Sequence, residues 1–96
     1  MNDVRLAWEA HRRAGWPEFS SPHRGALMTL DTVISGCVTY YLDERQLDRQ
    51  RVAILTECAD ELDALLPDIP DDASAYFLGL QALARLLLRE GPPRPR

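Results

Sequence analysis

The feature that most constrains the fold of this 96-residue chain is the spacing of its apolar residues. In four segments they recur every three or four positions, which is the period of one face of an α-helix. No segment shows the two-residue alternation of a half-buried strand. The clearest helical pattern consists of Ile54, Leu55, Cys58, Leu62, Leu65 and Leu66. The pattern predicts an all-α fold.

Residues with known preferences at helix ends mark the first two helices. The first helix is expected over residues 3–14, because Gly15 favours the left-handed conformation that ends a helix. The second is expected to have Ser21 as its N-cap and Pro22 at its first position, where the missing N–H of proline is tolerated. It is expected to run to about Leu42.

The last two helices have similar signals. Asp48 is the expected N-cap of the third helix, and Pro67 is expected to stop it. Asp71 or Asp72 is expected to cap the fourth helix, which runs to about Glu90. Because the connections between the last three helices are short, these helices are predicted to be antiparallel neighbours.

These elements predict one helical domain over residues 1–91, a small three- to four-helix up-down bundle. A short N-terminal helix is expected to lie across three longer helices and pack on them. Trp16 and Phe19 are expected to pack back on the bundle, because a solvated linker has no need of large aromatic side chains. Residues 92–96 are expected to be a disordered tail of proline and arginine.

Charge argues against a nucleic-acid partner. The formal net charge is −4, and residues 54–72 contain acidic but no basic side chains. Because nucleic-acid binding depends on neutralising phosphates, no nucleic-acid partner is expected. All eleven basic residues are arginine, which suggests a bacterial protein from a GC-rich genome.

The hydropathy pattern favours a cytoplasmic location. The N-terminal residues lack the basic and apolar regions of a signal peptide. No stretch approaches the ~20 apolar residues of a membrane-spanning helix. No membrane association is therefore expected.

No motif for catalysis, for a cofactor or for a metal is found. His11 and His23 do not form the closely spaced ligand pairs of a zinc site with each other or with the cysteines. Cys37 and Cys58 lie on apolar helix faces and are expected to be buried free thiols. We therefore expect no catalytic residues, no cofactor and no bound metal.

Asp31 lies at the edge of the apolar face of the second helix. A half-buried carboxylate needs a partner, and the simplest candidate is an arginine of the first helix. A role in binding is the alternative.

Two helices have more apolar surface than a bundle needs. The second helix has no charged residue between Asp31 and Asp43, and the fourth has leucines outside its central stripe. Either the first helix and the loop over residues 16–19 cover these surfaces, or they form an interface. With the acidic side of the third helix, the candidate partner-binding residues are Thr32, Ser35, Gly36, Thr39, Leu78, Leu88, Glu57, Asp60 and Glu61.

These features favour a non-catalytic protein–protein interaction module: an adaptor, an assembly subunit or a small acidic inhibitor of the immunity-protein type. Its partner would be another protein or a second copy, as in a homodimer. The alternative is a small-molecule-binding module or a small helical enzyme. Its site would lie in the bundle, with Asp31, Tyr40 and Tyr41 as polar contacts.

Overall fold

Helices dominate the computed structural model, which describes residues 3–93. No strand is present within this range, which confirms the prediction of a small all-α bundle. The elements are α1 (Asp3–Ala14), α2 (Arg24–Glu44), α3 (Arg49–Leu65), the short 3-10 helix η1 (Leu66–Asp68) and α4 (Asp71–Glu90).

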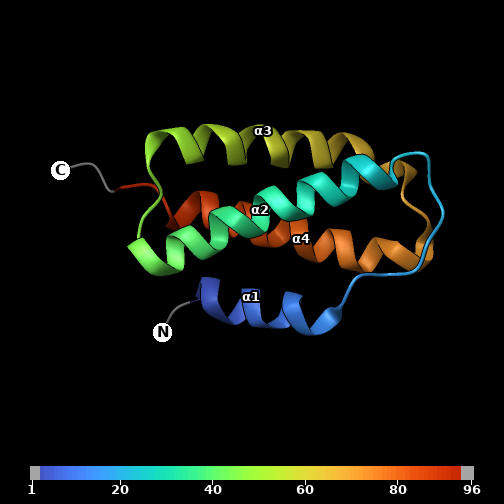
Figure 1. Cartoon of the computed structure of the whole chain (residues 1–96), viewed down its shortest axis with the longest axis horizontal. Coiled ribbons are helices and arrows are strands. Elements are labelled where there is room, and N and C mark those ends of the chain that lie inside the picture. The colour runs from blue at the N-terminus through green and yellow to red at the C-terminus, as the bar shows by residue number, and fades with distance from the viewer. Residues whose placement is uncertain (1–2, 94–96) are drawn as a thin grey trace.

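Consecutive helices run in opposite directions (Figure 1). The helices α1 and α3 lie on opposite sides of the molecule, with α2 and α4 between them. The N-terminal helix differs from the expectation in one respect: it lies alongside α4 rather than across the bundle. The apolar side of α1, which includes the buried Val4, therefore packs mainly against α4.

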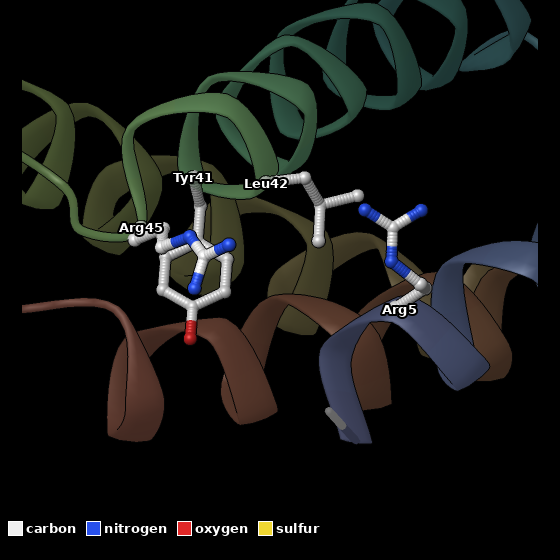
Figure 2. Close-up of a pocket in the computed structure, with 4 residues that line it drawn as sticks. All are labelled: Arg5, Tyr41, Leu42 and Arg45. Atoms are coloured by element: carbon white, nitrogen blue, oxygen red, sulfur yellow. The ribbon is translucent and has the colours of Figure 1, made fainter. Parts of the chain in front are cut away.

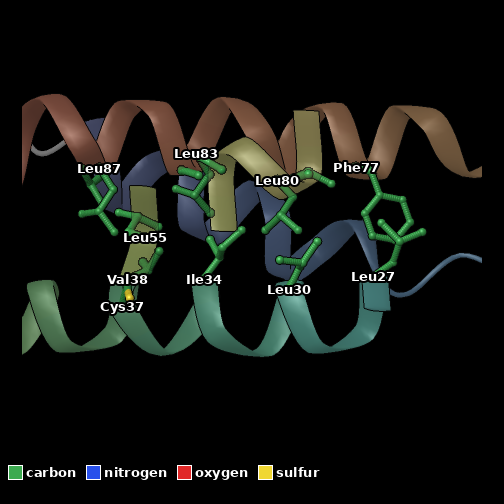
Figure 3. Packing of buried hydrophobic residues seen from close by; sticks show 14 of the residues in the cluster. Leu27, Leu30, Ile34, Cys37, Val38, Leu55, Phe77, Leu80, Leu83 and Leu87 are labelled. Atoms are coloured by element: carbon green, nitrogen blue, oxygen red, sulfur yellow. The ribbon is translucent and has the colours of Figure 1, made fainter. Parts of the chain in front are cut away.

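The core is built from the facing stripes of α2 and α4, with α3 closing one side (Figure 3). In α3 the fully buried residues are Leu55, Ala59 and Leu62, which recur every three or four positions. Packed between α2 and α4 are Leu27, Leu30, Ile34, Val38, Phe77, Leu80, Leu83 and Leu87.

The turn between α2 and α3 is tied to the end of α4. The side chain of Asp48 accepts a hydrogen bond of 2.8 Å from the backbone N–H of Arg51, which confirms Asp48 as the N-cap. The N–H of Leu47 donates to the carbonyl of Gly91 over 2.8 Å. A Cβ at position 91 would lie 2.7 Å from the backbone carbonyl oxygen of Leu87 and 2.9 Å from the Leu47 side chain, so this close approach requires glycine.

Two predicted helix starts are wrong. The helix α2 begins at Arg24 rather than Pro22, because the Ser21 hydroxyl accepts a local hydrogen bond from the N–H of His23 and forms a turn before the helix. In α4, Asp71 is already helical and Pro70 is the N-cap, so neither Asp71 nor Asp72 caps the helix. Both aspartates still lie in its first turn, where negative charge is favourable.

The aromatic residues between α1 and α2 pack on α4, as predicted. The ring of Trp16 lies 5.6 Å from those of Tyr76 and Phe77, and Phe19 lies 5.6 Å from Phe77, all measured between centroids. The linker is thereby held against the N-terminal half of α4. The predicted disordered tail falls largely on residues 94–96, which lie outside the described residues.

Candidate functional site

One face of α2 is uncharged and uncovered. Between Asp31 and Asp43 this helix carries no charged side chain. The hydroxyls of Thr29 and Thr32 donate to carbonyls of their own helix over 3.2 and 3.0 Å, so their hydrogen-bonding needs are met without a tertiary partner. We call this surface the α2 face; it comprises Met28, Thr29, Thr32, Ser35, Gly36 and Thr39, all exposed except the half-buried Ser35.

The structure tests one of the two alternatives for this surface, namely that α1 and the linker over residues 16–19 cover it. The helix α1 packs mainly on α4, and the aromatic linker packs on Phe77 and Tyr76 of the same helix. Neither element covers the α2 face, so within residues 3–93 this face is open to solvent. The site residues predicted on α2 are brought together on one surface.

A groove runs along one edge of the α2 face. It has a volume of about 290 Å³. It contains Ile54, which was predicted to be buried but is 36% exposed. The buried stripe of α3 is centred on Ala59, which turns Ile54 away from the core and toward α2. We call this the α2–α3 groove; its lining residues are Val33, Gly36, Cys37, Gln50, Arg51 and Ile54.

The only arginine lining this groove is engaged by neighbouring side chains. The guanidinium carbon of Arg51 lies 3.7 Å from the centroid of the Tyr40 ring, within the range of a cation–π contact. Its Nη1 lies 2.7 Å from a carboxylate oxygen of Asp48. Positive charge at this end of the groove is therefore compensated.

The acidic residues of α3 divide between two sides of the helix. Asp60 faces α4, where its carboxylate lies 3.8 Å from Arg85, and Asp63 binds Arg85 as well. Glu57 and Glu61 have no ion-pair partner among residues 3–93. Their charges act on the thiol of Cys58, on the side of α3 that faces α2. The unpaired acidic residues therefore lie beside the α2–α3 groove.

Both cysteines are free thiols, as predicted. Cys37 is buried and Cys58 half-buried. Burial is the main cause that raises the pKa of each thiol, and the nearby Cys37, Glu61 and Glu57 raise that of Cys58 further. At neutral pH the two groups are therefore neutral thiols rather than nucleophilic thiolates.

The predicted residues on α4 do not join this surface. Leu78 is 55% exposed and neighbours Gly79, which lines a different cleft between α1 and α4. Leu88 is half-buried and packs against the core, so it is less available than expected. The acidic residue Asp60 is likewise turned toward α4. Of the predicted set, the α2 residues share one surface, and Glu57 and Glu61 lie on the side of α3 that faces α2.

Asp31 joins three helices, but not through an arginine of α1. Its Oδ1 lies 3.0 Å from Nε2 of His11, whose side chain is 7% exposed, and its Oδ2 accepts a hydrogen bond of 2.9 Å from the Tyr76 hydroxyl. The expected arginine partner was wrong. The sequence did contain a signal for this cluster. His11, Asp31 and Tyr76 are polar residues that lie on the inner sides of α1, α2 and α4.

The Tyr76 phenol gives an expected pH dependence. Burial, with the hydrogen bond to Asp31, raises its pKa above the ordinary value of about 10. The native state therefore holds this proton at pH values where the unfolded chain loses it. We expect the titration of this group to leave the free energy of unfolding unchanged below about pH 10 and to lower it as the pH rises further.

Urea unfolding followed by circular dichroism between pH 8 and 11 measures this effect. The two thiols also have raised pKa values, so they too lower the free energy of unfolding as the pH rises. The informative comparison is therefore between the wild type and Tyr76→Phe. The variant should be less stable at pH 8, since it loses a hydrogen bond to a carboxylate, and its stability should decline less steeply above pH 10. Equal slopes would contradict the assignment.

The polar residues of the alternative small-molecule site do not converge. Asp31 is engaged by His11 and Tyr76. Tyr40 lies under Arg51, and Tyr41 lines a separate cleft. The three side chains therefore make separate contacts and do not surround a common site in the described residues.

No group of three or more His, Cys, Asp or Glu within the described residues is arranged to hold a metal ion. None of the helices in this range is long and apolar enough to span a membrane. Comparison of the chain with protein-family models, with curated proteins and with solved structures gives no match.

Proposed function

We propose that this chain is a non-catalytic protein-binding module. The α2 face and the α2–α3 groove would receive a basic amphipathic helix of another protein. The observation that carries the proposal is an uncharged, uncovered helix face next to a groove that has apolar side chains on both sides and two unpaired glutamates beside it. Laying the apolar side of a helix into such a groove is a common mode of recognition between proteins.

The surface has the composition that this mode requires. Gly36 lies in the groove, and an added Cβ would meet no atom within 4 Å, so the backbone is open to close approach by a partner helix. Val33 and Ile54 supply apolar contacts on either side of it. A glycine in a helix interior destabilises the helix by about 1 kcal/mol relative to alanine, so its presence here is consistent with a need for space.

Charge favours a partner that is basic and is not a second copy. Glu57 and Glu61 lie beside the groove, and opposite charge on the partner would raise the rate of association. A second copy docked on the same face would bring the same acidic residues into the interface. Like charges that face each other disfavour that pairing.

The two glycines Gly36 and Gly79 allow a matched test. Each lies inside a helix, each is exposed, and neither has an atom within 4 Å of an added Cβ. Arginine has a better helix propensity than glycine, so Gly36→Arg and Gly79→Arg should both be folded and more stable by roughly 0.5–1 kcal/mol. Only Gly36→Arg should block binding, since its side chain fills the groove and opposes a basic partner.

The measurement is recovery of a stoichiometric partner by the tagged protein from its source cells, followed by titration calorimetry with that partner. We expect Gly36→Arg to lose the partner and Gly79→Arg to retain it. Binding of the partner by the wild type should weaken at higher salt. Loss of the partner with Gly79→Arg alone would place the interface at α4. A partner retained by both variants would contradict the proposal.

A further inference from the structure

A cleft lies between the start of α1 and the end of α2. It has a volume of about 370 Å³ and is lined by Arg5, Tyr41, Leu42 and Arg45, which together we call the arginine cleft. Figure 2 shows the guanidinium of Arg45 in front of the Tyr41 ring and that of Arg5 on the other side of Leu42. Two cationic groups from distant parts of an acidic chain therefore line one cleft.

Arg45 occupies a backbone position that favours glycine. It is the C-cap of α2, and its φ of 65° is the one positive φ of a non-glycine residue in the range 3–93. Helix ends of this type usually carry glycine or asparagine, because a Cβ is strained in the left-handed conformation. The side chain makes no ion pair with the other described residues. No intramolecular ion pair within this range compensates for the strain.

The lining suits an oxyanion attached to a small organic body. Guanidinium groups present planar sets of N–H donors that match carboxylate and phosphate oxygens. The Tyr41 ring and the Leu42 side chain offer apolar walls beside them. The C-terminal end of α2 carries partial negative charge that opposes an anion, so more than one guanidinium is needed to hold it.

We propose that the arginine cleft binds a small organic anion, a carboxylate or a phosphate monoester, held between Arg5 and Arg45. The volume lies near the lower end of the range for ligand pockets, which limits the ligand to a small molecule. This site is separate from the α2–α3 groove, and its ligand does not depend on the protein partner proposed above. The strained conformation of Arg45 is retained because the guanidinium is needed in the cleft.

Thermal unfolding with defined probes tests the site. The probes are phenyl phosphate, inorganic phosphate and succinate, each added at constant ionic strength with sodium chloride as the reference. A ligand that binds only the native state raises the Tm by an amount that grows with its concentration relative to its Kd. We expect at least one probe to raise the Tm of the wild type, and the comparison of phosphates with succinate identifies the anion class.

Arg45→Gly separates binding from stability. Because glycine accepts the positive φ, this variant should have a higher Tm than the wild type without probe, yet its response to the probe should weaken at least tenfold in apparent affinity. Arg45→Gln keeps the strained backbone and should lose the response without the gain in Tm. Arg13→Gln, at an exposed position at the other end of α1, should respond as the wild type does.

Three results would overturn the proposal. The first is the absence of a wild-type response to all three probes. The second is an equal response to chloride, which would show general salt stabilisation only. The third is a response of Arg45→Gly and Arg45→Gln equal to that of the wild type, which would place the bound anion elsewhere.

Discussion

Replacing Leu80 by glutamate is expected to unfold the protein, whereas the same change at Leu78 leaves it folded. Leu80 is 0% exposed and lies between α2 and α4, while Leu78, two residues away, is 55% exposed. An unpaired carboxylate at position 80 costs several kcal/mol in addition to the lost apolar burial. That is comparable to the total stability expected for a domain of this size, roughly 5–14 kcal/mol.

Circular dichroism and urea unfolding of the two variants measure this difference. Leu78→Glu should change the free energy of unfolding by no more than about 0.5 kcal/mol, as exposed substitutions do. If Leu78→Glu unfolded the chain, or Leu80→Glu melted like the wild type, α4 would have a different rotation about its axis from that in the structure.

Phe77→Ala is expected to lower the free energy of unfolding by about 3–5 kcal/mol. The ring is fully buried, and the rings of Trp16, Phe19 and Tyr76 lie 5.6, 5.6 and 5.0 Å from it in edge-on arrangements. Truncation therefore removes a large apolar side chain together with aromatic contacts that position the linker between α1 and α2.

The matched control is Leu6→Ala, because Leu6 is 56% exposed on α1. It should change stability by less than about 0.5 kcal/mol. Urea unfolding gives both values, and the fluorescence of Trp16 in a Trp8→Phe background reports on the linker. A loss at Phe77 no larger than that at Leu6 would contradict the assignment of Phe77 to the core.

The helices could be predicted from the sequence because their signals are local. The first helix matches its predicted range of residues 3–14, and Gly15 follows it with a φ of 72°. Asp48 caps α3 as its side-chain chemistry suggests. The start of α2 was wrong because the Ser21 hydroxyl has a competing local hydrogen bond, which a residue preference does not reveal.

The candidate site depended on tertiary packing and could be predicted only in part. The lack of charge on α2 was visible in the sequence, but whether α1 would cover that face depended on which helix α1 packs against. Ile54 was wrongly assigned to the core. The buried side of α3 is centred on Ala59, and a small rotation of the helix about its axis is enough to exclude Ile54 from it. The partners of Asp31 lie 20 and 45 residues away in sequence, beyond any local pattern.

Binding of a basic helix on the α2 face is tested most directly by site-specific photo-cross-linking in the source cells. A photo-activated amino acid is placed at Thr32, on the α2 face, or at Leu6, on the exposed side of α1. We predict an adduct from position 32 to a basic segment of a different protein, abolished by Gly36→Arg, and no such adduct from position 6. Equal adducts from both positions, or an adduct that survives Gly36→Arg, would contradict the assignment of the α2 face as the binding surface.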